Sequence, residues 1–136
     1  MQKLNKEQLK KLLPHREPML LLDEVWEGGG QYTFKGDEFF LQGHFPNEKI
    51  VPAVILIEIM AQSTCMLPHN AGDTGNKQTL FVGMNDIKIR AKVVPGDTFI
   101  TEVSIKQHKG PMYMIDAKGF IDGKQVISGV LSFIVT

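Results

Sequence analysis

Two kinds of hydrophobic pattern divide the chain. In the C-terminal half, apolar and polar residues alternate with a period of two, which is typical of a β-sheet with one face in solvent. The segment FVGMNDIKIRAKV (81–93) alternates in this way, FITEVSIK (99–106) repeats the pattern, and PGD (95–97) turns the chain between them. Asp122-Gly123 is a strong two-residue hairpin signal between two further strands. We expect these last strands to form an antiparallel meander.

The middle of the chain follows a different pattern. AVILIEIMAQSTCML (53–67) contains no helix breaker between Pro52 and Pro68, and proline suits the first turn of a helix. This length predicts one helix of about four turns. Its surface is apolar nearly all round, with Glu58 and Gln62 as the main exceptions. We therefore expect this helix to be buried on most sides.

The N-terminal part predicts a short helix and a hairpin. Asn5 can cap a short amphipathic helix that Pro14 ends. MLLLDEVWE (19–27) then indicates a strand, GGG (28–30) a turn, and QYTFKGDEFF (31–40) a strand that runs back antiparallel. The whole pattern predicts an α+β fold: roughly six antiparallel strands around one long central helix, after a short N-terminal helix.

Length, charge and cysteine content narrow the class of protein. The 136 residues, 43% of them hydrophobic, fit a single domain over positions 1–136, and an exposed sheet edge would favour a homodimer. Basic residues (Lys plus Arg) and acidic residues (Asp plus Glu) number 15 each. The formal net charge is therefore zero, and no overall electrostatic field would attract nucleic acid. The single Cys65 cannot form an internal disulfide, which favours a reducing, cytoplasmic compartment. Neither an export signal, nor a membrane span, nor a metal cluster is expected from the pattern.

His44 and Glu58 are the first candidates for chemistry. Gly43 and Pro46 restrict the backbone on both sides of His44, which would hold its imidazole still, although a turn histidine bonded to backbone is the alternative. Burying an ionised carboxylate without a partner costs several kcal/mol. One interpretation is that Glu58 reaches solvent at the edge of the helix or pairs with Lys or Arg. The other is that it stays protonated and can donate a proton at neutral pH.

Three further residues of the central helix can assist these two. Gln62 lies one turn beyond Glu58, so its amide either hydrogen-bonds the carboxyl group or is simply a polar residue near the helix end. The backbone N–H groups of Ala53 and Val54, at the helix start, can hold a carbonyl oxygen as negative charge develops on it. An acid, a base and an oxyanion site would then converge.

Three motifs in the same order resemble the β-hydroxyacyl-acyl carrier protein dehydratases of fatty-acid synthesis. GHFPNEKIVPAVILIEIMAQ (43–62) is similar to that family's GHFPxxPxMPGVLxxEAMAQ, with the same spacing of 14 between histidine and glutamate. LLPHREPMLLLDEV (12–25) is similar to LPHRxPFLLVDRV, and VVPGDTF (93–99) to a VxPGD turn. The resemblance covers nearly the whole chain.

The resemblance implies a hotdog fold, in which an antiparallel sheet wraps a long helix, and a homodimer that often assembles further into a hexamer. Each active site would combine the histidine of one subunit with the glutamate of the other and need no cofactor. His44 would take the α-proton of a (3R)-hydroxyacyl thioester on acyl carrier protein, and Glu58 would protonate the departing hydroxyl. Glutamate rather than aspartate at position 58 implies plain dehydration, without isomerisation.

One departure from the family motif leaves two other functions open. Ala53 stands where the family has glycine, and its methyl group would crowd a thioester. A hotdog thioesterase would use Glu58 to activate water or attack the thioester, which leaves His44 without a task. If Ala53 prevents the thioester carbonyl from binding at the helix start, the chain would be a non-enzymatic acyl-binding module.

Other polar residues carry weaker signals. Lys88, Arg90 and Lys92 alternate along one predicted strand face, which fits either a docking patch for an acidic carrier protein or an ordinary solvated face. His15, Arg16 and His69 have no chemical partner that the sequence indicates. We interpret Arg16 as structural and His69 as a loop residue.

Overall fold

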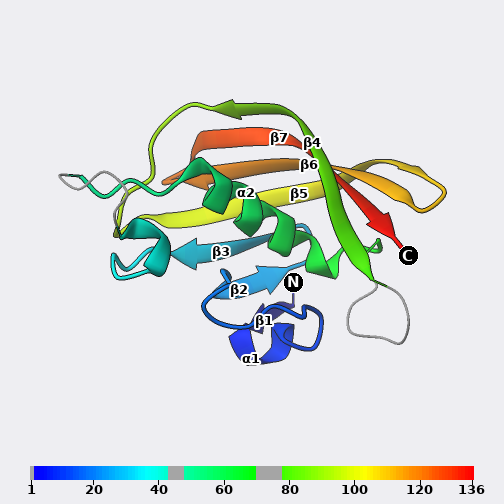
Figure 1. Cartoon of the computed structure of the whole chain (residues 1–136), viewed down its shortest axis with the longest axis horizontal. Helices are drawn as coiled ribbons and strands as arrows, with labels where there is room; N and C mark the ends of the chain where they lie inside the picture. The colour runs from blue at the N-terminus through cyan, green and yellow to red at the C-terminus, as the bar shows by residue number, and fades with distance from the viewer. Residues whose placement is uncertain (1, 43–47, 70–77) are drawn as a thin grey trace.

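The computed structural model describes residues 2–42, 48–69 and 78–136. In these ranges a seven-stranded antiparallel sheet in the order β1-β2-β3-β5-β6-β7-β4 lies against the helix α2 (Figure 1). The strands are β1 (Lys3–Asn5), β2 (Glu24–Trp26), β3 (Gly29–Thr33), β4 (Thr79–Ile89), β5 (Thr98–Lys109), β6 (Met112–Ile121) and β7 (Lys124–Val135). The helices are α1 (Lys6–Leu9) and α2 (Ala53–Gln62), with 3-10 turns η1 (Phe39–Leu41) and η2 (Ser63–Met66). The arrangement is the α+β hotdog fold that the sequence predicted.

The central helix forms where the apolar run predicted it. Pro52 is its N-cap, with a φ of −59°, and α2 continues directly into η2, so the helical path covers the expected four turns. The last turn is tightened because the Ser63 hydroxyl donates to the Ile59 carbonyl at 2.7 Å, and the Thr64 hydroxyl to the Ala61 carbonyl at 2.7 Å. The helix packs its core-facing side against the sheet and ends inside the protein.

The N-terminal predictions need several corrections. The strand predicted over 31–40 ends at Thr33, and Phe39–Leu41 form the 3-10 turn η1. Only the last part of the predicted strand 19–27 pairs as β2, because Leu20, Leu21 and Leu22 are buried at successive positions and cannot alternate between core and solvent. The turn predicted over 28–30 involves Gly28, with a φ of 96°, whereas the next two glycines already belong to β3. Asn5 caps α1 as predicted, in a capping box with Gln8, although α1 is a single turn.

The order of the C-terminal strands also differs from the prediction. Strands β5, β6 and β7 form the expected meander, but β4 pairs with β7 and not with β5. The free side of β5 is taken by β3, so β4 crosses to the far edge of the sheet. Two irregularities in β4, between Phe81 and Gly83 and between Asn85 and Lys88, interrupt the period of two. The seventh strand is β1, which the sequence did not predict.

Gly119 in β6 leaves the space that the ring of Phe99 in β5 fills. A methyl group at Gly119 would lie 2.2 Å from two ring carbons of Phe99 and 2.9 Å from Cγ2 of Ile127. Both neighbours are fully buried, so they have no room to move aside. We predict that Gly119→Ala lowers the free energy of unfolding by about 1–3 kcal/mol in urea denaturation, the usual cost of overpacking. Gly83→Ala is the control, since a methyl there meets only Ser132 Cβ at 3.9 Å; equal losses in both variants would contradict this account.

Candidate active site

Three residues at intervals of four form a stripe along α2. Val54, Glu58 and Gln62 lie on one face of the helix because four residues make slightly more than one turn. Burial increases along this stripe: Val54 is 67% exposed, the Glu58 side chain 27%, and Gln62 only 2%. Glu58 therefore lies at the boundary between the core and an open surface.

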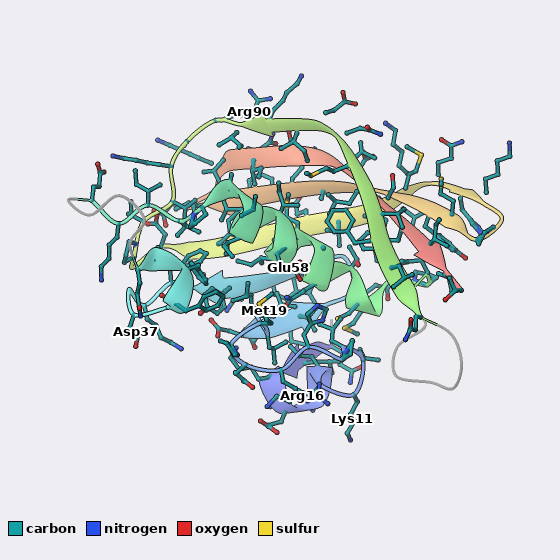
Figure 2. The ribbon with its side chains drawn as sticks, in the orientation of Figure 1. Lys11, Arg16, Met19, Asp37, Glu58 and Arg90 are labelled. Atoms are coloured by element: carbon teal, nitrogen blue, oxygen red, sulfur yellow. The ribbon has the colours of Figure 1, made fainter. Side chains whose placement is uncertain are left out.

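Gln62 holds the carboxyl group of Glu58 from the buried side. Its Nε2 donates to Glu58 Oε2 at 2.8 Å and to the Met19 carbonyl at 2.8 Å, while its Oε1 accepts the Leu21 N–H at 2.9 Å. The backbone donor fixes which end of the amide is oxygen, so the NH₂ group must face Glu58. Figure 2 shows Glu58 midway along α2 with Met19 close to it. The structure thus agrees with the first interpretation of Gln62, in which its amide hydrogen-bonds the carboxyl group of Glu58.

His15 is the partner of Glu58 that the sequence did not indicate. Its Nε2 lies 3.5 Å from Glu58 Oε2, and both side chains are about one-third exposed. The contact forms because the segment after α1 folds back onto α2, where Gln62 binds it. His15 lies within the motif LLPHREPMLLLDEV, which is the one signal that could have identified it. Arg16 is structural, as interpreted: its Nη1 donates to the carbonyls of Leu13 at 2.9 Å and His15 at 2.8 Å.

The start of α2 lies beside an apolar hollow. Pro52 offers no side-chain cap, and within the described ranges no acceptor faces the N–H groups of Ala53 and Val54. A hollow of about 390 Å³ adjoins them, lined by residues 50–54, Leu56, Ile89 and 91–93. Free helix N–H groups carry partial positive charge, so a carbonyl oxygen can bind at this point.

Two predicted site residues cannot be placed. Gly43 and His44 lie outside the described residues, so the position of His44 relative to Glu58 stays a prediction.

The three residues of the predicted basic stripe do not share one strand, because β4 ends at Ile89, before Arg90 and Lys92. Lys88 and Arg90 line a hollow of about 690 Å³ on the outer side of the sheet, where Figure 2 labels Arg90 far from Glu58. Lys92 lies beyond the end of β4, borders the other hollow and forms an ion pair with Glu48. The outer hollow also holds Lys118 and three acidic residues: Asp86, Glu102 and Asp116. Its charge is therefore balanced.

Two further reactive side chains are enclosed in the core. Burial raises the pKa of the Cys65 thiol to about 12, which keeps it protonated and a poor nucleophile. His69 lies in a turn, as interpreted, but is buried: its ring packs near Tyr113 and Phe133, and burial lowers its pKa to about 4. The described residues contain no cluster of potential metal ligands. Among them, no helix combines the length and apolar character that crossing a membrane requires.

Comparison with known proteins identifies the family. The FabA-like domain matches residues 13–129. The 3-hydroxyacyl-[acyl-carrier-protein] dehydratases FabZ of Staphylococcus epidermidis and Staphylococcus aureus are each 37% identical over 134 residues, covering 94% of this chain and 92% of theirs. The chain belongs to the β-hydroxyacyl-acyl carrier protein dehydratase family. Glu58 and Gln62 lie in the second of the three motifs that resemble this family, and His15 lies in the first.

Solved structures confirm the fold. The dehydratase heterocomplex ApeI:P from Xenorhabdus doucetiae superposes with a TM-score of 0.74 at 17% identity, covering 94% of this chain and 90% of that chain. A fluoroacetyl-CoA-specific thioesterase, FlK, superposes with a TM-score of 0.65 at 11% identity, covering 89% and 90%. At these identities the likeness shows the hotdog fold alone. A dehydratase and a thioesterase both have this fold, so it does not distinguish the two reactions.

We predict that Gln62→Leu destabilises the protein strongly. The change leaves the Leu21 N–H and the Met19 carbonyl without their partner, and an unsatisfied buried backbone group costs about 1–3 kcal/mol. The free energy of unfolding in urea should fall by about 2–4 kcal/mol. Gln107→Leu, at an exposed position of β5, is the matched control and should change it by less than about 0.5 kcal/mol. A Gln62→Leu variant as stable as the control would mean that the three hydrogen bonds contribute nothing.

Proposed function

We propose that the chain converts a (3R)-hydroxyacyl thioester on acyl carrier protein into a trans-2-enoyl thioester and water. The observation that carries this proposal is that the FabZ likeness extends over 94% of the chain and includes Glu58, whose carboxyl group Gln62 orients at the edge of the core. The FabZ relatives act, by name, on 3-hydroxyacyl groups on acyl carrier protein. Fatty-acid synthesis is the process in which such a substrate arises.

The proposed reaction needs one acid and one base. His44 of one subunit removes the proton from the α-carbon, and the electron pair of that C–H bond forms the double bond between the α- and β-carbons. The bond from the β-carbon to its oxygen breaks, and Glu58 of the other subunit gives its proton to the departing hydroxyl, so that water leaves. The support for Glu58 is its position: with about a quarter of its side chain exposed, it can reach both a substrate and the core amide that fixes its rotamer.

The thioester carbonyl would bind at the start of α2. Removal of the α-proton places negative charge on the carbonyl oxygen, and the free N–H groups of Ala53 and Val54 can stabilise it. Val54 lies on the same helix face as Glu58, about 6 Å away along the axis at 1.5 Å per residue. The adjoining apolar hollow suits the aliphatic part of the substrate. Ala53 retains the backbone N–H that would contact the oxyanion. Its methyl group only reduces the room for the thioester beside that N–H.

A second copy of the chain is part of this proposal. Strand β4 is an open edge of the sheet, and large apolar side chains on it are exposed to between 41% and 54%: Leu80, Phe81, Val82, Met84 and Ile89. Edge-to-edge pairing of two copies would satisfy the unpaired backbone groups of β4 and cover these side chains. A homodimer, which can assemble further into a trimer of dimers, follows from that pairing.

A carrier-docking role for Lys88, Arg90 and Lys92 has less support. The outer hollow that contains the first two carries as many acidic as basic side chains, and Lys92 is paired with Glu48. An acidic partner would gain little from a balanced surface. Docking at these three residues stays a prediction.

We predict that Glu58→Gln abolishes most dehydration. Glutamine keeps the shape of the side chain but cannot donate an acidic proton, and general acid catalysis contributes about 10²–10⁴-fold to rate. The assay follows the absorbance of the conjugated enoyl thioester formed from a 3-hydroxyacyl group on acyl carrier protein, for the wild type and the variant.

Thiol release in the same reactions separates the rival functions. Release of free thiol without enoyl product by the wild type would identify a thioesterase, and absence of both products would identify an acyl-binding module. Full dehydration by Glu58→Gln would contradict the role of Glu58. Glu102→Gln, on the outer side of the sheet, is the matched control and should leave the rate unchanged.

A further inference from the structure

The two described polar contacts of the Glu58 carboxyl group, a hydrogen bond from Gln62 and a longer contact with His15, involve the same oxygen. Gln62 Nε2 lies 2.8 Å and His15 Nε2 3.5 Å from Oε2. No residue in the described part of the chain donates a hydrogen bond to Oε1. The two oxygens of the carboxyl group are therefore in different environments, with only Oε1 left for a substrate.

The surroundings of the His15 ring decide which of its nitrogens carries the proton. Nδ1 is buried and has no hydrogen-bond partner among the described residues. A proton on Nδ1 would be a buried donor without an acceptor, which is unfavourable, whereas a proton on Nε2 faces the carboxyl group. The neutral ring thus carries its hydrogen on Nε2 and acts toward Glu58 as a donor.

We propose that His15 is a positioning residue for Glu58, which makes Oε2 the acceptor oxygen and leaves the transferable proton on Oε1. This inference rests on the proposed dehydration. When the acid is protonated, Oε2 is its carbonyl oxygen and accepts from Gln62 and His15, while Oε1–H points to the β-hydroxyl group. As the Oε1–H bond breaks and the proton joins the departing oxygen, negative charge appears on the carboxylate.

The distance of 3.5 Å suits this role in the free protein. A neutral imidazole and a carboxyl group at this separation interact weakly, because a good N–H···O bond spans 2.7–3.2 Å in general. Contacts of catalytic groups often shorten once the substrate is bound, and an ionised acceptor shortens the bond further. His15 therefore stabilises the charged product of proton transfer more than the starting acid, which accelerates the step.

The position of His15 does not depend on its own side chain. Arg16 Nη1 binds the carbonyls of Leu13 and His15, and Gln62 fixes the backbone of Met19 and Leu21. The Arg16 contacts fix the local backbone around His15, and the Gln62 contacts hold the end of the segment against α2. Changes of the His15 side chain should leave the fold and the position of the segment intact.

The test compares two replacements of His15. His15→Phe keeps a planar ring but removes the donor, whereas His15→Gln places a side-chain N–H near the position of Nε2. With a 3-hydroxyacyl group on acyl carrier protein, we expect kcat of His15→Phe to fall about 10- to 100-fold with KM unchanged, the size expected for losing one hydrogen bond to a charged group. His15→Gln should recover to within about threefold of the wild type. His108→Phe, at an exposed position of β5, is the matched control and should leave kcat unchanged.

The outcomes separate this inference from the proposed function. Wild-type kcat in His15→Phe, or equal losses in both His15 variants, would overturn the positioning role while leaving dehydration intact. Absence of enoyl product from the wild type would overturn both. A measurement that needs no activity is the tautomer of His15, read from long-range ¹⁵N–¹H correlations: a proton on Nε2 is expected, and a proton on Nδ1 would contradict the inference.

Discussion

The amide of Gln62 is the interaction on which the rest of the site depends. Its oxygen and nitrogen bind the backbone of Leu21 and Met19, which attaches the N-terminal segment to the central helix, and the same nitrogen orients Glu58. Because Gln62 is buried, water does not compete for these bonds. One residue thus joins the stability of the fold to the direction of the Glu58 carboxyl group, the proposed acid, and brings His15 within reach of it.

The increase in burial along α2 gives Glu58 the partly exposed position that the proposed acid needs. A carboxyl group deep in the core would have no access to substrate, and one fully in water would lose its fixed direction. Glu58 is between these limits, and the face toward Val54 is open in a single copy of the chain. In the proposed dimer, the exposed apolar edge of β4 is the surface on which a second copy pairs. Dimerisation and completion of the site are, in this account, one event.

The sequence predicted those parts of the fold that local pattern determines. Two prolines bracket the apolar run that becomes α2 and η2, and alternation with an Asp-Gly turn predicts β5, β6 and β7. Pairing of β4 with β7 was missed because it depends on β3 occupying the side of β5, which is a long-range choice. The single strand face expected for Lys88, Arg90 and Lys92 was misjudged because β4 ends at Ile89, before the last two of these residues.

The sequence predicted the helix residues of the candidate site but not the residue from the N-terminal segment. The helix residues Glu58 and Gln62 could be found because they interrupt an apolar run and match a family motif. His15 was missed because 43 residues separate it from Glu58, and only the return of the segment after α1 brings them together. The buried position of His69 was missed for the same reason, since its aromatic neighbours come from β6 and β7.

The central claim is that one subunit's His44 and the other subunit's Glu58 serve the same active site, and subunit complementation tests it most directly. His44→Ala and Glu58→Gln are each inactive alone in this account. In a mixed dimer, one site contains both intact residues and the other contains neither. An equal mixture that exchanges subunits should therefore recover about a quarter of the wild-type rate, since half of the dimers are mixed and half of their sites are intact. No recovery, with mixed dimers present by native mass spectrometry, would contradict the account.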